Sequence, residues 1–229
     1  MTNLSSSNEI FFSIDMEADG PVPFTNSMLS LAVVAFEGNG TEIAQWECNL
    51  KPLAGAVQDP RTMTEFWAKN QEAWNYCNTN TVESSVAMPH LVDWVDSVGQ
   101  GKQKVAVCFP AGYDFTWLYT YLMKFGGVSP FSFSCIDMKT YASALIKLPY
   151  RECGKKRWPR RWFDPKLPHT HKAVDDAREQ GLAFLKMRAE NLKGPQAVEE
   201  VSKSFWAAGK GTLSSPFLEY SYLNPIGAK

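Results

Sequence analysis

The sequence has 229 residues, of which 45% are hydrophobic, and its formal net charge at pH 7 is −1. This composition excludes a disordered chain and is sufficient for one well-filled hydrophobic core. The near-zero net charge gives no general attraction to nucleic acid, so a surface that binds nucleic acid would have to be local.

The cysteines and the N-terminus indicate a cytoplasmic protein. The five cysteines form no Cys-x-x-Cys pair and are odd in number, which predicts reduced thiols rather than disulfides. No apolar run has the length of a membrane span, so we expect no membrane partner. The first seven residues lack the charged and apolar regions of a signal peptide.

The first predicted strand covers residues 10–14, where aromatic and β-branched residues lead into two acids, Asp15 and Glu17. Side chains two positions apart on a strand face the same way, so these carboxylates project together. They repel each other unless a proton or a cation lies between them, and their oxygen atoms suit Mg²⁺ or Mn²⁺. The alternative is a strand end with two solvated acids.

The next elements are predicted to be an antiparallel hairpin and a helical block. Residues 28–36 and 41–50 form two strands joined by the Gly38-Asn39-Gly40 turn. Two or three helices follow over residues 60–99, with Asp59 as the N-cap and Pro60 at the first helical position. Within this block, a rough apolar stripe indicates the buried helix face: Val82, Val86, Leu91, Val95 and Val98.

The second half alternates between strands and helices. We predict strands over 104–109 and 131–136, helices over 114–125, 138–147 and 172–191, and an irregular segment over 149–170. Asp137 is the expected N-cap of the 138–147 helix. A further helix over 196–208 and an aromatic segment, 217–222, complete the chain. Together these elements predict an α/β fold, with a mixed sheet flanked by helices. We place the main domain at 1–194 and a C-terminal extension at 195–229, which packs on the core or on a partner subunit.

Two later stretches carry further candidate ligands. Asp114 follows a buried strand, where its carboxylate can point over the sheet edge toward Asp15 and Glu17; the alternative is a helix N-cap. His171 and Asp176 can serve one site only if His171 precedes its helix, because five residues on a helix turn through about 140°. Pro168 makes a loop before His171 the expected structure.

The three stretches together resemble the DEDDh exonucleases of the ribonuclease H-like superfamily. The family pattern matches Asp15-Met16-Glu17, Tyr113-Asp114 and, near the end, His171-Lys172-Ala173-Val174-Asp175-Asp176-Ala177. The resemblance covers about residues 9–190 and implies a mixed five-stranded sheet. The segment from Asp59 to Trp67 is similar to the mycobacterial-type and phage exoribonuclease-like branch, although Phe66 stands where a Trp is usual. Phe109-Pro110 departs from the His-Asn common in the wider family.

The resemblance implies a metal-dependent 3′→5′ exonuclease. Two divalent cations, Mg²⁺ or Mn²⁺, roughly 4 Å apart would stabilise the charge on the attacked phosphate and on the leaving oxygen. His171 would be the general base, since an imidazole with the ordinary pKa of about 6.5 suits that role near neutrality. The implied ligands of the cations, which are catalytic together with His171, are Asp15, Glu17, Asp114 and Asp176.

The implied substrate is the 3′ end of single-stranded nucleic acid, with RNA favoured over DNA. A DNA-trimming or proofreading exonuclease is the alternative, followed by a non-catalytic nucleic-acid-binding module, and a homodimer is expected from the family. The 151–162 segment has six cations and two Trp residues, which either bind the strand or form a solvated loop anchored by its Trp residues. The candidate substrate contacts are Ala18, Phe66, Trp67, Arg157 and Arg160.

Overall fold

The computed structural model describes residues 8–167 and 170–193. The helix predicted over 196–208, the aromatic segment 217–222 and the extension 195–229 lie outside these described residues. No helix in the described ranges is long and apolar enough to cross a lipid bilayer. All five cysteines are free thiols, as the sequence predicts.

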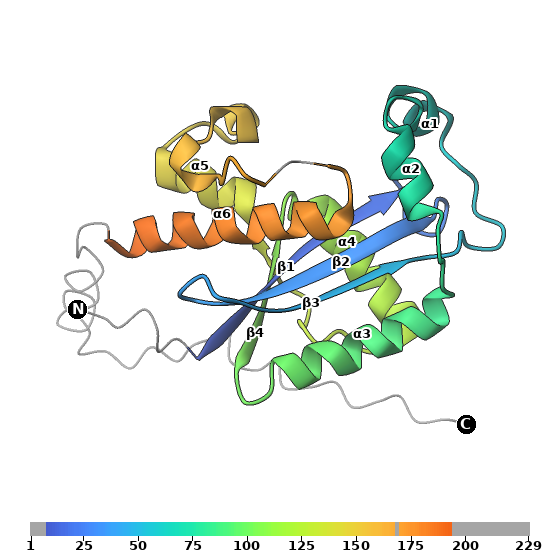
Figure 1. Ribbon diagram of the computed structural model, residues 1–229, viewed down its shortest axis with the longest axis horizontal. Helices are drawn as coiled ribbons and strands as arrows, with labels where there is room; N and C mark the ends of the chain where they lie inside the picture. Colours follow the sequence, from blue (N-terminus) through green and yellow to red (C-terminus); the bar gives the residue numbers. More distant parts are fainter. Residues whose placement is uncertain (1–7, 168–169, 194–229) are drawn as a thin grey trace, which may run out of the picture. The chain divides into compact units, whose positions relative to one another are not determined.

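A mixed five-stranded sheet forms the centre of the fold, in the order β3-β2-β1-β4-β5 (Figure 1). β1 (Glu9–Ala18) pairs antiparallel with β2 (Met28–Glu37), which pairs antiparallel with β3 (Glu42–Asn49). On its other side β1 pairs parallel with β4 (Gln103–Cys108), and β4 pairs parallel with β5 (Ile136–Asp137). The predicted α/β architecture and sheet are therefore confirmed.

The helices begin close to where the capping residues predict. The Asp59 side chain accepts a hydrogen bond from the Thr62 amide at 2.7 Å, and Asp137 does the same for Thr140 at 2.7 Å. The helices are α1 (Pro60–Glu65), α2 (Gln71–Cys77), α3 (Ser84–Val98), α4 (Ala111–Tyr121), α5 (Met138–Ile146) and α6 (Ala173–Lys193). Short 3₁₀ and π turns lie between them: η2 (Trp67–Lys69), η3 (Leu122–Gly126), η4 (Tyr150–Glu152), η5 (Lys155–Arg157) and η6 (Arg160–Trp162).

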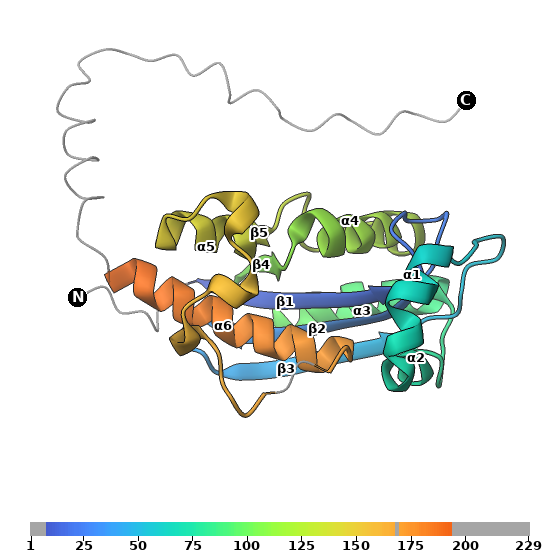
Figure 2. The same ribbon diagram turned by 90° about the horizontal axis from the view of Figure 1, so that it is seen from above.

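Helices cover both faces of the sheet (Figure 2). The alternation of side chains along β1 determines which of its residues face each layer of helices. Phe12 and Ile14 belong to the core formed with α3 and α4, whereas Phe11 belongs to the core formed with α5 and α6. Asp15 and Glu17 have the same parity as Phe11, so they face α6. The strand pattern therefore directs both acids toward the helix that carries the last sequence motif.

Gly181 lets α6 lie close against the sheet. A Cβ at this position would overlap the Phe36 ring and would lie 2.9 Å from the Cβ of Ser13. Since real side-chain atoms do not pack so closely, only glycine permits this separation between α6, β1 and β2.

Two predictions about elements are wrong in part. The strand expected over 131–136 is reduced to Ile136–Asp137, because Phe131 leaves the sheet and packs on Phe12 with 5.4 Å between ring centroids. The predicted stripe on α3 includes Val86, which is 60% exposed. Leu91 and Val95 of the predicted stripe are buried, and the other buried residues of α3 are Ser84, Ala87, Met88 and Val92.

Candidate active site

Asp15 on β1 contacts α6 directly. The Gln180 side-chain amide donates a hydrogen bond to Asp15 Oδ1 at 2.5 Å. Asp176 lies four residues before Gln180 on the same helix face and is 1% exposed. Gln180 is not among the residues predicted from the sequence, although its spacing of four from Asp176 indicates a second residue directed at the same site.

Glu17, His171 and Asp176 form one group, in which one possible ligand atom of each residue lies within 4.8 Å of the others. His171 precedes α6, as predicted, and its φ of +56° is in the left-handed region. The Thr170 amide donates to Asp176 Oδ1 at 3.2 Å, which joins this loop to the start of α6. The neighbouring Asp175 instead accepts from the Thr170 hydroxyl at 2.8 Å.

Asp114 approaches the same acids from α4. It lies in the first turn of that helix, whose N-cap is Pro110, so the interpretation of Asp114 as an N-cap is wrong. Its side chain is 4% exposed, and its Oδ2 atom has no hydrogen-bond partner among the described residues. A buried carboxylate oxygen left in this way requires a proton or a cation for stability.

The electrostatics show that the carboxylates converge. Burial raises the pKa of Glu17 well above its ordinary value, and the charges of Asp15 and Asp176 raise it further. Burial likewise raises the pKa of Asp114, with added repulsion from Asp15 and Glu17. The donor set consists of oxygen atoms with one imidazole, and its members repel one another. Such a set fits divalent cations of the Mg²⁺ or Mn²⁺ type.

The aromatic residues of the predicted substrate surface are mostly buried. Trp67 is 1% exposed, and its indole N–H donates to the Ala18 carbonyl at 3.0 Å. Trp158 and Trp162 are 4% and 1% exposed and belong to the core beside α6, so they anchor their segment rather than stack on bases. Phe66 is only partly buried, and its ring contacts the imidazole of His171.

The two predicted arginine contacts lie at the surface. Arg157 and Arg160 are both exposed, and Arg157 has an ion pair with Glu152 at 3.7 Å. No contact in the described residues joins either arginine to the group of acids.

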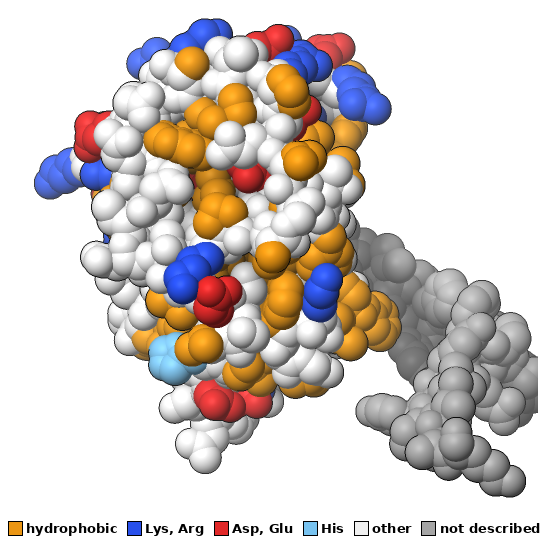
Figure 3. All heavy atoms as spheres, turned by 90° about the vertical axis from the view of Figure 1, so that its right-hand side faces the viewer, with side chains coloured by type: hydrophobic (Ala, Val, Ile, Leu, Met, Phe, Trp, Pro, Cys, Tyr) orange, Lys and Arg blue, Asp and Glu red, His pale blue; other side chains and the backbone are white. Residues whose placement is uncertain are grey.

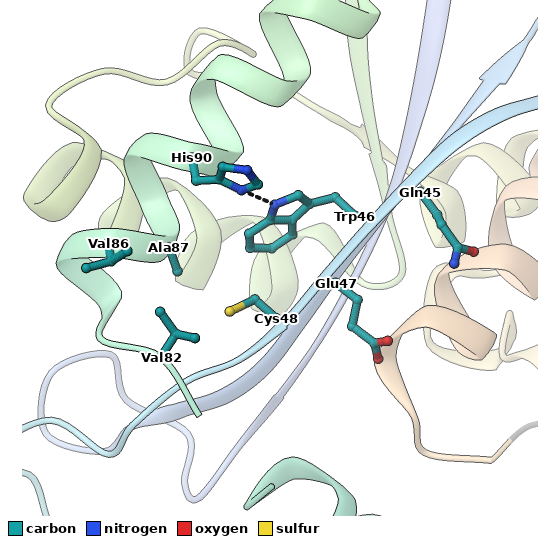
Figure 4. A pocket seen from close by; sticks show the side chains of 8 residues that line it. All are labelled: Gln45, Trp46, Glu47, Cys48, Val82, Val86, Ala87 and His90. Carbon is teal, nitrogen blue, oxygen red and sulfur yellow. Dashed lines mark hydrogen bonds between the residues drawn. The ribbon is translucent and has the colours of Figure 1, made fainter. Parts of the chain in front are cut away.

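A polar cavity of about 470 Å³ adjoins His171 and lies between the segment 69–73 and the segment 170–172. A second cavity, of about 400 Å³, lies between β3 and α3 (Figure 4) and contains none of the four acids or His171. In it the Trp46 indole donates to His90 Nδ1 at 2.9 Å. His90 therefore has a structural role in the packing of α3 on β3.

Comparison with known proteins gives a relative that matches over most of its length and many similar folds. The chain is 30% identical over 188 residues to the 3′-5′ DNA exonuclease Cap18 of Escherichia coli, covering 79% of this chain and 92% of that protein. No protein-family model matches the sequence.

Solved structures of the same fold include the nuclease domain of 3′hExo, a DEDDh family member bound to rAMP. Its TM-score is 0.58 at 12% identity, covering 83% of this chain and 96% of that one. Pop2p of S. pombe, in a form with Mg²⁺ and Mn²⁺ bound, has a TM-score of 0.58 at 14% identity, covering 81% of this chain and 85% of that one.

Proposed function

This chain belongs to the DEDDh family of 3′-5′ exonucleases, and we propose that it removes nucleotides from the 3′ end of single-stranded DNA by metal-assisted hydrolysis. The observation that carries the proposal is the convergence of four carboxylates from β1, α4 and α6, and of one imidazole from the loop before α6, on one place. Their order in the chain and their spacing match the family pattern.

Each side chain has a role in the proposed reaction. Two divalent cations, when bound, neutralise charge on the attacked phosphate and on the leaving 3′-oxygen and favour the ionisation of water. Asp15, Glu17, Asp114 and Asp176 would hold the cations. His171 accepts a proton from the attacking water, and its place before α6 lets the imidazole approach the Glu17–Asp176 end of the site. Gln180 fixes the orientation of Asp15.

DNA is the first candidate substrate because the relative that matches over 92% of its length is named a DNA exonuclease. RNA, which the sequence analysis favours, is the second candidate. The sequence resemblance supports it, as does the related fold of 3′hExo, whose structure holds rAMP. A nuclease distinguishes RNA from DNA by the space and the hydrogen-bond partners that it provides for the 2′-hydroxyl of ribose.

Digestion of 5′-labelled single-stranded DNA and RNA of identical sequence, with Mg²⁺ or Mn²⁺, tests this proposal. We expect a ladder that shortens from the 3′ end and forms faster on DNA. Faster shortening of RNA would make RNA the first candidate. Internal cuts, or fragments that shorten from the 5′ end, would contradict the proposal.

A further inference from the structure

Lys155 is a half-buried cation held beside the acids. It begins η5, in the basic segment between α5 and α6, and its Nζ atom lies 2.9 Å from Glu179 Oε2. The side chains of Lys155 and Glu179 are 23% and 12% exposed. The ammonium group also lies 5.2 Å from the ring centroid of Phe109. Two contacts on different elements therefore fix this side chain in one position.

Both contacts belong to the immediate surroundings of the site. Glu179 is three residues after Asp176 on α6, and Phe109 is followed by the turn into α4, which carries Asp114. The charge of Lys155 acts on Asp114 itself, whose pKa it lowers against the larger effect of burial. Of the six cations in the 151–162 segment, Lys155 is thus the one that contacts both α6 near Asp176 and the residue before the turn into α4.

The site has two chemically different ends. Glu17, His171 and Asp176 form the compact group at one end, where His171 would receive the proton of the attacking water. Asp114 is not part of that group, and Lys155 lies over the ring of Phe109, which directly precedes the N-cap of the helix that carries Asp114. In Figure 1 and Figure 2 the start of α6 lies between α1–α2 and the gold segment that follows α5.

In an in-line displacement the attacking water and the leaving oxygen lie on opposite sides of the phosphorus atom. With His171 on the water side, the leaving 3′-oxygen lies toward Asp114, and the rest of the strand continues from that oxygen. The next phosphate of the strand, on the 5′ side of the scissile bond, is then the nearest anion that Lys155 can meet. An ammonium has three N–H donors, and the bond to Glu179 uses one of them.

We propose that Lys155 binds the phosphate immediately 5′ to the scissile phosphodiester and that Glu179 and Phe109 hold the ammonium in position for this contact. This inference rests on the proposed exonuclease function. It assigns to Lys155 the role that the sequence analysis gave to Arg157 and Arg160. Figure 3, which shows the end of the molecule with α1 and the carboxyl end of β1, has side chains of both charges among hydrophobic patches.

Two substrates separate this role from a structural one. A single-stranded oligonucleotide contains the 5′ phosphate, whereas the p-nitrophenyl ester of thymidine 5′-monophosphate contains only the bond to be cleaved. We compare Lys155→Met with Lys156→Met, which removes the same charge from an exposed neighbour in the same turn. Lys155→Arg keeps the positive charge and tests rescue.

Lys155→Met should lower kcat/KM on the oligonucleotide about tenfold, mainly through KM, because one charge-assisted contact is lost. The salt dependence of oligonucleotide binding should become shallower by about 0.7 in the log–log slope. Hydrolysis of the nitrophenyl ester should change less than about twofold. Lys156→Met should resemble the wild type on both substrates, and Lys155→Arg should recover part of the oligonucleotide activity.

Equal losses on the two substrates in Lys155→Met would overturn the inference, because Lys155 would then act on the acids or on the fold. An unchanged KM and salt slope would overturn it as well. A wild-type protein that hydrolyses neither substrate would instead overturn the proposed function, and the inference with it. Titration with Mn²⁺ is the control for an indirect effect on the acids. Equal Mn²⁺ affinity of Lys155→Met and the wild type would show that the acids still bind the cation.

Discussion

The ring of Phe66 meets the imidazole of His171 edge to face, with 5.0 Å between the ring centroids and 85° between the planes. His171 has a left-handed backbone, a conformation that L-residues seldom adopt and that the surrounding contacts must maintain. The Thr170 contacts to Asp175 and Asp176 hold the loop from the α6 side, while Phe66 holds the ring from the other side. The orientation of the imidazole therefore depends on a residue that binds no cation.

Phe66→Leu should lower kcat up to about tenfold and change KM little. An edge-to-face aromatic contact contributes about 0.5–1.5 kcal/mol beyond its buried area, and here that contact orients the general base. Steady-state kinetics on single-stranded DNA measures the effect. Phe133→Leu is the matched control, because Phe133 is 82% exposed. A Phe66→Leu protein with wild-type kcat would contradict a positioning role for this ring.

Gln180→Leu should weaken the binding of divalent cations about tenfold to a hundredfold, the usual range for a partner that orients a ligand. The substitution removes the donor to Asp15 while it keeps a side chain of similar size. It also removes Gln180 Oε1, which is buried without a hydrogen-bond partner among the described residues, so the fold should not be weakened. Calorimetric titration with Mn²⁺ measures the affinity, with exposed Gln100→Leu as control. Unchanged affinity in Gln180→Leu would show that Asp15 needs no such support.

The metal-free protein should become less stable as the pH rises. Burial and mutual repulsion raise the pKa values of Glu17 and Asp114, so the folded protein holds protons that the unfolded chain has already released. Between the unfolded carboxyl pKa of about 4 and the raised values, the free energy of unfolding therefore falls with increasing pH.

Thermal unfolding in a chelator, repeated at several pH values from about 5 to about 8, tests this sign. Tm should fall across the series, and saturating Mg²⁺ should raise Tm most at the highest pH, where the acids are charged. A Glu17→Gln, Asp114→Asn double variant should lose most of this pH dependence. A Tm that rises with pH in the wild type but not in the double variant would contradict the assigned direction.

Gly181→Ala should lower the free energy of unfolding by about 1–3 kcal/mol, as overpacking of a core does. The added methyl group would push α6 away from Phe36 and Ser13 and would displace Asp176 and Gln180 as well. Activity should therefore fall together with stability in urea unfolding and DNA digestion. Gly112→Ala is the control, because a Cβ at Gly112 would meet no atom within 4 Å. Equal stability of the two variants would contradict the close approach of α6 to the sheet at Gly181.

Local patterns were sufficient to predict the mixed sheet with its flanking helices, whereas the full set of four acids and His171 came from the family resemblance. Period-two alternation placed Asp15 and Glu17 on one face, and the order of the motifs brought Asp114 and Asp176 to them. The remaining features depend on three-dimensional packing. Lys155 comes from a segment with five other cations, and residue type alone does not separate Lys155, whose ammonium bonds to Glu179 on α6, from those five.

Phe131 illustrates the same limit for secondary structure. A run of aromatic and β-branched residues favours a strand, yet the ring gains more by filling the core against Phe12 than by extending β5. The left-handed backbone conformation of His171 could not be predicted from the sequence either, because only the contacts around residue 171 impose it.

The adjacent aspartates of α6 allow the most direct test of the central claim, that the converging acids are the exonuclease site. Asp176 is buried and faces Glu17 and His171, whereas Asp175 bonds to the Thr170 hydroxyl and lies near Arg178. The measurement is the initial rate at which 5′-labelled single-stranded DNA shortens from its 3′ end in Mg²⁺, for the wild type, Asp176→Asn and Asp175→Asn. The account predicts a loss of roughly a thousandfold or more in Asp176→Asn and a change of at most a few-fold in Asp175→Asn. Comparable rates for wild type and Asp176→Asn would contradict it.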